Sequence, residues 1–259
     1  MRGRVRKAVI PAAGHGTRLL PLTFSQPKEM LACGRLPVIG YVLDELRSAG
    51  IKEILLISRL GKPSLEEYVF AQWPGAFLIR QEEQLGLGHA VSLARSWIGE
   101  EAFVVALGDT IIQSNRESSP LSRLILQREA ESSIVLVREV LSHQIHRYGI
   151  VDPITHPVPG EAFSLRGIIE KPDPSVAPSN LAVAGRYVFS HRVFRCLEQI
   201  APSGDGEIQL TDAMRLLCDN PGEMCAASLL PGERRFDIGN FDSYFEAFNA
   251  LAATSHLTN

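Results

Sequence analysis

The stretch Val9–Leu31 reads VIPAAGHGTRLLPLTFSQPKEML and joins a strand-like apolar run to a glycine loop and fixed positive charge. Gly14 and Gly16 allow backbone N–H groups to approach an anion closely. Arg18 and Lys28 supply positive charge within the same short stretch. We interpret it as a phosphate-binding loop that follows the first strand of an α/β fold.

The two common phosphate loops do not fit this stretch. A dinucleotide-binding loop needs a third glycine where this chain has Leu19. The Gly-Lys-Ser/Thr ending of a P-loop is absent as well. A different kind of phosphate-binding fold is therefore expected.

Composition narrows the class of protein further. The chain has 259 residues, 45% of them hydrophobic, which is enough for one large folded domain. A formal net charge of −3 gives no overall basic surface, so neither nucleic acid nor an anionic membrane is an expected partner. The four cysteines lack CxxC spacing, which favours reduced thiols in a cytoplasmic protein. The N-terminal apolar run is broken by Pro11 and Gly14, so we expect neither a signal peptide nor a membrane span.

The first half alternates short apolar runs with helical patterns, the order that builds a mostly parallel sheet flanked by helices. Strands are expected at KAVIPA (7–12), EILLIS (53–58), 77–79 and AFVVALGDT (102–110). Helices are expected over 37–50, 63–73 and 87–94. Ser64 and Glu67 could open the second of these helices as a capping box.

The second half is less regular. Extended segments are expected at SSIVLVREV (132–140), YGIV (148–151), LRGIIEKP (165–172) and LAVAGRYVFS (181–190). They predict further sheet together with a hairpin or small β lobe. Helices are expected over 193–199, 211–218 and 243–251. Because there is no internal repeat or long linker, we expect a single domain over residues 1–259.

Several motifs then point to one family. The pattern G-x-G-T-R-x-x-P, followed by P-K, resembles the signature of the sugar-1-phosphate nucleotidylyltransferases. The segments RQEEQLGLGHA, YGIV, EKPDPSVAPSNLAVAGRYVFS, GDGEIQLTDA and FDIGN are similar, in the same order, to bacterial UTP–glucose-1-phosphate uridylyltransferases. The resemblance runs from about Lys7 to Ala250.

The resemblance implies a Rossmann-like, nucleotide-diphospho-sugar transferase type of mixed sheet with a small β hairpin lobe. It implies a nucleotide-binding half at about 7–110 and a sugar-phosphate-binding half at about 111–250. The implied substrates are UTP and glucose 1-phosphate, whose phosphate oxygen attacks the α-phosphorus in line to give UDP-glucose and pyrophosphate. Such a reaction depends mainly on positioning and on neutralising phosphate charge, without a covalent enzyme intermediate.

The resemblance also assigns residues on the nucleotide side. Uracil would be met by the backbone of the glycine loop and by an amide that matches its edge, at Ala13, Gly14, Gln81 and Gly86. The triphosphate would be held by Arg18, nearer the leaving pyrophosphate, and by Lys28 as a point charge.

Two carboxylates and a sugar site complete the implied set. Asp109 and Asp237 would bind Mg²⁺, which takes one or two carboxylates plus substrate phosphates. Glu170 would accept hydrogen bonds from glucose hydroxyls, and Lys171 would meet the sugar phosphate if the chain turns directly after it.

Gly149 and Val183 would line the sugar pocket through backbone groups. Sites that hydrogen-bond hydroxyls can reject wrong sugars by about 10⁴-fold. These residues would therefore contribute to the choice of sugar.

The sequence departs from the family in two places. LGDT (107–110) replaces the Pro-Asp form common in uridylyltransferases and resembles thymidylyl- and mannose-1-phosphate relatives. The segment between EILLIS and RQEEQ is short and the C-terminal extension is reduced, so whether the chain forms a homo-oligomer stays open. Two alternatives stay open as well: a thymidylyl- or other sugar-1-phosphate nucleotidylyltransferase, and a non-catalytic sugar-nucleotide sensor or regulatory subunit. The presence of all the charged site residues disfavours the sensor.

Overall fold

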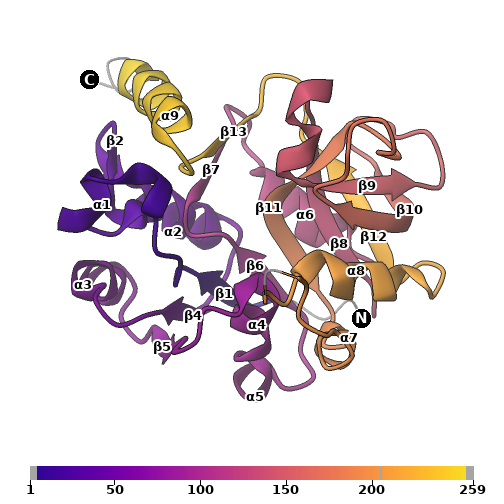
Figure 1. Ribbon diagram of the computed structural model, residues 1–259, viewed down its shortest axis with the longest axis horizontal. Coiled ribbons are helices and arrows are strands. Elements are labelled where there is room, and N and C mark those ends of the chain that lie inside the picture. Colours follow the sequence, from indigo (N-terminus) through magenta and orange to yellow (C-terminus); the bar gives the residue numbers. More distant parts are fainter. Residues whose placement is uncertain (1–4, 205, 255–259) are drawn as a thin grey trace.

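A computed structural model describes residues 5–204 and 206–254, and a nine-stranded mixed sheet runs through them (Figure 1). In order across the sheet its strands are β5 (Phe77–Arg80), β4 (Glu53–Ser58), β1 (Lys7–Pro11), β6 (Phe103–Ala106), β11 (Leu181–Phe189), β8 (Ser133–Glu139), β12 (Met224–Ser228), β10 (Ala162–Glu170) and β9 (Gly149–Pro153). The first four are parallel, whereas β11 runs antiparallel to both of its neighbours β6 and β8. The predicted Rossmann-like mixed α/β sheet is confirmed.

Helices cover both faces of the sheet because its strands are apolar on both sides. Within β1, Ala8 and Ile10 pack on one face and Val9 packs on the other. The first face is covered by α2 (Val38–Ser48), α3 (Pro63–Gln72) and α6 (Pro120–Gln127). The second is covered by α4 (Gly86–Ser92), α5 (Arg95–Ile98), α7 (Val193–Leu197) and α8 (Leu210–Cys218). Strands buried on both faces are typical of a parallel sheet between helical layers.

Two short ribbons and several short helices lie outside the main sheet, near the carboxyl ends of its parallel strands. A two-stranded ribbon pairs β7 (Thr110–Gln113) with β13 (Arg234–Asp237), and a second ribbon pairs β2 (Ala32–Cys33) with β3 (Leu36–Pro37). The glycine loop leads into η1 (Thr17–Leu19), α1 (Leu22–Ser25) and η2 (Lys28–Met30), and η3 (Ser142–Arg147) precedes β9. The last helix, α9 (Phe241–Thr254), lies beside β2 and β13 (Figure 1).

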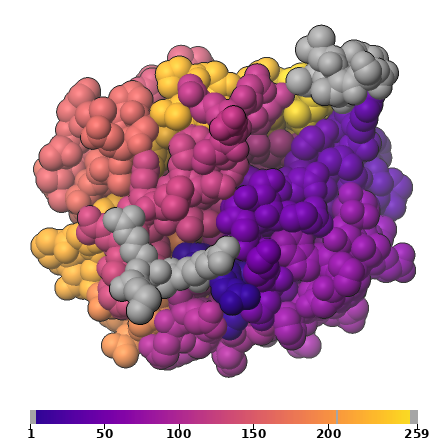
Figure 2. Space-filling model, turned by 180° about the vertical axis from the view of Figure 1, so that it is seen from behind, coloured from indigo at the N-terminus to yellow at the C-terminus, as the bar shows by residue number. Residues whose placement is uncertain are grey.

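Seen from behind, the two halves of the chain occupy different sides of the surface, apart from the yellow C-terminal part along the top (Figure 2). The purple surface of the first half lies on one side, and the magenta-to-orange surface of the second half lies on the other. The sheet joins them, because β6 of the first half pairs with β11 of the second.

Most predicted elements are present, with instructive differences. The helix expected at 37–50 is α2, and it stops before Gly50, whose φ of 81° suits only a residue without a side chain. The strand expected at 102–110 ends at Ala106, and the chain turns before β7 begins. The predicted capping box is wrong: α3 starts with Pro63 as its first residue, and no side chain caps it. The expected hairpin is β9–β10, at the edge of the main sheet.

The four cysteines form no disulfide, and burial raises the pKa of Cys33 to about 11 and that of Cys218 to about 12. Both thiols are therefore protonated at neutral pH. Across residues 5–204 and 206–254, no helix has the length and apolar character needed to cross a membrane.

A fully buried arginine connects the sheet to the ribbon. Arg186 on β11 donates from Nε to Glu45 Oε2 on α2 at 2.9 Å. Its Nη2 donates to the carbonyl of Thr110 at 2.8 Å, and its Nη1 donates to the carbonyls of Gly185 at 3.0 Å and Leu107 at 3.5 Å. The guanidinium thus fixes the turn between β6 and β7 by binding backbone carbonyls at both ends of it.

Replacing Arg186 with methionine should lower the free energy of unfolding by about 3–5 kcal/mol, because Glu45 would be left as an unpaired buried charge. Urea unfolding measures this loss. Arg166→Met is the matched control: Arg166 pairs with Asp152 at 3.3 Å but is 65% exposed, so its loss should cost at most about 1 kcal/mol. Equal costs for the two variants would contradict the role given to Arg186.

Candidate functional site

Two adjoining pockets, each of about 500 Å³, open at the carboxyl ends of β1 and β6. One, here named the loop pocket, is lined by the glycine loop at 11–18. The other, named the sheet pocket, is lined by residues of β9, β10, β11 and β13 and by the start of α8. Arg18, Leu87 and Leu107 line both pockets. Ligands collect at this edge of open α/β sheets.

The predicted residues divide between the two pockets. The loop pocket holds all of those expected to meet the nucleotide together with one carboxylate: Ala13, Gly14, Arg18, Lys28, Gln81, Gly86 and Asp109. The sheet pocket holds those expected to meet the sugar phosphate, the second carboxylate and the shared arginine: Arg18, Gly149, Glu170, Lys171, Val183 and Asp237. The fold therefore brings every predicted site residue to one of two neighbouring cavities.

The glycine loop presents its backbone to the loop pocket. Gly16 has a φ of 69°, and a Cβ there would lie 3.1 Å from Thr23 Cγ2, so a side chain would be strained and crowded. Thr23 Oγ1 donates to the carbonyl of Gly16 at 2.9 Å and holds the turn. A Cβ on Gly14 would lie 3.9 Å from Lys28 Nζ, so the ammonium faces the same space as the loop backbone.

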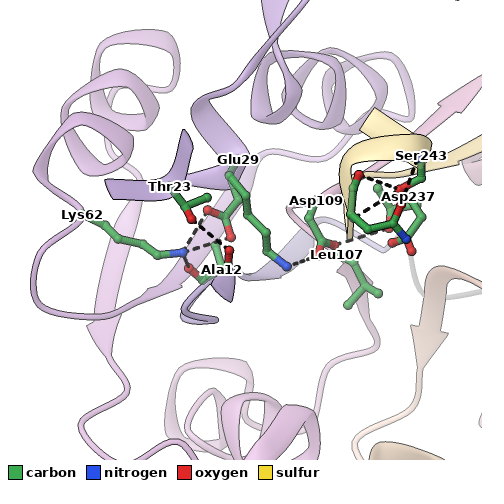
Figure 3. Close-up of polar contacts among 12 residues, drawn as sticks. Ala12, Thr23, Glu29, Lys62, Leu107, Asp109, Asp237 and Ser243 are labelled. Carbon is green, nitrogen blue, oxygen red and sulfur yellow. Dashed lines mark hydrogen bonds and ion pairs between the residues drawn. The ribbon is translucent and has the colours of Figure 1, made fainter. Parts of the chain in front are cut away.

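Lys28 and Asp109 form an ion pair across the loop pocket (Figure 3). Lys28 belongs to η2, and Asp109 belongs to the turn between β6 and β7. Burial alone would raise the pKa of Asp109, but the Lys28 ammonium, with help from Arg235, outweighs burial and lowers it. Burial likewise opposes the charge of Lys28, but Asp109 and Glu29 outweigh it and raise the lysine pKa. Both groups are therefore charged at neutral pH.

The second carboxylate, Asp237, reaches the same place from β13. Its Cα pairs in register with Thr110 on β7, and the N–H of Ile238 donates to the carbonyl of Asp109 at 2.9 Å. Asp109 and Asp237 are far apart in sequence, but the pairing of β7 with β13 brings the turn that holds Asp109 next to Asp237, at the border of the two pockets (Figure 3). A Cβ on Gly239 would lie 3.0 Å from Asp237 Oδ2 and 3.5 Å from Arg18 Nη2. Positive and negative side chains thus flank Gly239.

Carboxylate oxygens are ligands that Mg²⁺ prefers, and the two aspartates at the border of the pockets fit such an ion in type. In the part of the chain that the structure describes, no group of three or more histidine, cysteine, aspartate or glutamate side chains could hold a metal. An ion at this border would need further oxygen ligands from a bound substrate or from water.

Gln81 and Gly86 form the far wall of the loop pocket. Gln81 is buried, and its Nε2 lies 3.2 Å from the carbonyl of Gly86 and 2.9 Å from Nδ1 of His89. A Cβ on Gly86 would lie 2.8 Å from Glu207 Cβ, so only glycine lets this segment approach the loop before α8. The main chain is tied there by Ile208, whose carbonyl accepts from Gly88 at 2.8 Å.

In the sheet pocket, Glu170 and Lys171 face the same cavity although they are neighbours at the end of a strand. Lys171 has a φ of 45°, so the chain turns there, and its N–H donates to the carbonyl of Tyr148 at 3.0 Å. Lys171 Nζ lies 3.4 Å from Glu170 Oε1. The turn expected next to Pro172 is therefore present.

Glu170 is held by the start of α8. Thr211 Oγ1 donates to Glu170 Oε2 at 3.0 Å. A Cβ on Gly149 would lie 2.7 Å from Thr211 Cγ2 and 3.6 Å from Val183 Cγ2, so Gly149 is packed against both side chains. Any larger residue at position 149 would displace the threonine that orients the carboxylate.

Sequence reasoning missed Arg235, which lines the sheet pocket beside Asp237. Its side chain is only 5% exposed, Nε donates to the carbonyl of Ala184 at 3.2 Å, and Nη2 lies 3.5 Å from Asp237 Oδ1. The guanidinium lies 5.3 Å from the centre of the Tyr148 ring. A signal was present: residues two apart on a strand share a face, so Arg235 is expected on the side of Asp237.

Comparisons with known proteins show which family the chain belongs to. The family model described as nucleotidyl transferase matches residues 7–254. The UTP–glucose-1-phosphate uridylyltransferase of Bacillus subtilis (strain 168) is 39% identical over 261 residues, covering 91% of this chain and 87% of that protein. A UTP-bound UGPase from Acinetobacter baumannii is 33% identical with a TM-score of 0.85, covering 98% of each chain. A UDP-glucose pyrophosphorylase complexed with UDP-glucose is 31% identical with a TM-score of 0.88, covering 96% of this chain and 99% of that one. The chain therefore belongs to the nucleotidyl transferase family, as its motifs predict.

Proposed function

We propose that this chain joins UTP to glucose 1-phosphate, forming UDP-glucose and releasing pyrophosphate. The proposal rests mainly on the placement of two aspartates at the border of the two pockets. Asp109, just before β7, lines the loop pocket, and Asp237, on the paired strand β13, lines the sheet pocket. Substrates bound in the two pockets would meet at that border. Similarity to a uridylyltransferase and to structures holding UTP or UDP-glucose supports this pair of substrates.

The loop pocket would take UTP. The backbone of Ala13 and Gly14 would meet uracil, and the Gln81 amide, held beside Gly86, would match the donor and acceptor on the edge of the base. Arg18 and Lys28 would hold the triphosphate, with Arg18 nearer the leaving pyrophosphate.

The sheet pocket would take glucose 1-phosphate. Glu170, oriented by Thr211, would accept hydrogen bonds from sugar hydroxyls, and Lys171 would meet the phosphate. Gly149 and Val183 would line the sugar through backbone groups.

The chemistry is an in-line displacement at phosphorus. An oxygen of the sugar phosphate forms a bond to the α-phosphorus of UTP, and the bond from that phosphorus to the pyrophosphate oxygen breaks. The difficulty is to bring two anions together, so Arg18, Lys28 and Lys171 would lower the barrier by position and charge. Asp109 and Asp237 would hold Mg²⁺, which when bound neutralises phosphate charge.

We further infer that residues 1–259 work as one nucleotidylyltransferase domain. Most residues of the loop pocket come from about 7–110, the proposed nucleotide-binding half, and most of the sheet pocket comes from about 111–250, the proposed sugar-phosphate-binding half. Four free cysteines support a cytoplasmic location.

A substrate panel tests the proposal directly. Pyrophosphate release should be measured with Mg²⁺ across UTP, dTTP, GTP, ATP and CTP, each with glucose, galactose and mannose 1-phosphates. We expect the highest kcat/KM for UTP with glucose 1-phosphate. The extra methyl of thymine is worth only about 1–3 kcal/mol in a pocket, so dTTP is the expected runner-up. Preference for dTTP would favour a thymidylyltransferase. Tight binding of UDP-glucose without turnover would favour a sensor.

Asp109→Asn should lower kcat at least ~100-fold, the size of effect expected when a preorganised electrostatic group is removed. The thermal unfolding midpoint should fall only slightly, because the amide still fits the turn and Lys28, which loses its charged partner, faces a pocket where water can solvate it. Asp152→Asn is the matched control, since Asp152 pairs with Arg166 and lines neither pocket. A loss of less than tenfold would place the metal elsewhere.

Lys171→Ala should raise KM for glucose 1-phosphate about tenfold or more, as expected for a lost charge-assisted contact. The KM for UTP should change much less, because Lys171 lines only the sheet pocket. Steady-state kinetics with each substrate varied in turn separates the two constants, and the exposed Lys52→Ala serves as the control. Equal weakening of both substrates would count against the role given to Lys171.

A further inference from the structure

Lys62 and Glu29 form a buried ion pair behind the glycine loop (Figure 3). Their side chains are 4% and 1% exposed. Lys62 Nζ lies 3.0 Å from Glu29 Oε1 and 2.9 Å from Oε2, and it donates to the carbonyl of Ala12 at 2.6 Å. An ammonium has three hydrogens, and the structure provides an acceptor for each.

Such a pair is expensive to bury. Desolvation of both charges offsets much of their attraction, and apolar residues of similar volume often replace such pairs without loss of stability. Burial is also the largest influence on both pKa values, lowering that of Lys62 and raising that of Glu29. Stability alone therefore does not account for a lysine and a glutamate at these positions.

The ammonium connects the two ends of the segment that surrounds the loop pocket. Ala12 is where that segment leaves the sheet, held there by its N–H donating to the carbonyl of Ile57 at 2.8 Å. Glu29 lies in η2, directly after Lys28. Lys62 itself precedes α3, outside the segment. One cation thus ties residue 12 to residue 29, with the pocket between them.

The pair also sets the charge around Lys28. Glu29 is the residue directly after Lys28 in η2, and both line the loop pocket. If Lys62 were absent, the buried Glu29 carboxylate would lose the cation that contacts both of its oxygens and would have Lys28 as the next cation along the chain. It would then compete with an incoming phosphate for that lysine.

We propose that Lys62 and Glu29 are positioning residues for the nucleotide. They hold Lys28 and the backbone of the glycine loop in the geometry that receives the triphosphate. This inference rests on the proposed function, because it takes the loop pocket as the nucleotide site. Neither side chain needs to touch the reacting atoms.

Lys62→Met tests the inference, because methionine is similar in length and cannot donate. We expect KM for UTP to rise at least ~10-fold, because Lys28 and the glycine loop would no longer be held in place to bind the triphosphate in the loop pocket. The KM for glucose 1-phosphate should stay within about twofold of wild type, because the sheet pocket is unchanged. Lys62→Arg should recover much of the affinity for UTP. A residue with a merely structural role would lower the unfolding midpoint and leave the ratio of the two KM values unchanged.

Lys7→Met is the matched control. Lys7 Nζ also donates to a backbone carbonyl, that of Trp97 at 3.0 Å, and pairs with a carboxylate, Glu101 at 2.5 Å, but it lines neither pocket. Its KM values should be unchanged. If Lys62→Met fails to fold, Glu29→Gln decides, because it keeps the shape and one acceptor. Folded variants with a KM for UTP within twofold of wild type would overturn the inference.

The failure of this inference and that of the proposed function remain distinguishable. The substrate panel uses the wild type alone, whereas the Lys62 series is compared on whichever nucleotide the wild type turns over best. If the wild type has no turnover, the Kd of UDP-glucose from calorimetry replaces KM. A different nucleotide would therefore revise the proposed function and leave the test of positioning intact.

Discussion

A single buried guanidinium holds the turn on which the site depends. Arg186 donates to the carbonyls of Leu107 and Thr110, which bracket Asp109 on either side. Buried backbone carbonyls need partners, so the turn is held where the guanidinium can reach it. Glu45 on α2 supplies the countercharge. The turn that holds Asp109 is therefore fixed by Arg186 and Glu45, neither of which lines the loop pocket or the sheet pocket.

Charges of alternating sign continue from that turn across the loop pocket. The row runs from Lys62 through Glu29 and Lys28 to Asp109, with Arg235 beyond it. Lys28, the cation of this row that is expected to meet phosphate, thus already has a partner. An incoming phosphate would replace the carboxylate as the partner of the lysine. Part of the free-energy cost of removing water from these charges has already been spent during folding. On the proposed function, Lys28 is the member of the row that would exchange its carboxylate partner for phosphate.

Local sequence predicted the parts of this arrangement that depend on neighbours in the chain. The glycine loop needs positive φ at Gly16, and the motif around it identified the family. The sequence also indicates a turn beside Pro172, and the chain does turn there, although the φ of 45° at Lys171 is a left-handed value that a following proline does not favour. Periodicity likewise placed α2, because an apolar stripe and a terminal glycine are local features. The capping box failed because Pro63 set the start of α3 first.

What could not be predicted from the residues alone are the contacts that cross the sheet. Asp109 and Asp237 come together because β7 pairs with β13, and the spacing of residues in the sequence does not reveal that pairing. Only the resemblance to a family linked the two. Lys62 shows the limit more sharply: a lysine next to a helix start is ordinarily solvated, and nothing near it in sequence indicates Glu29 as its partner. Burying the Lys62–Glu29 pair costs free energy of folding, so local stability does not explain it. Its role becomes visible only in the folded structure, where the pair lies behind the loop pocket. That pocket is lined mainly by the first half of the chain, and Glu207 and Gly239 from the second half complete it.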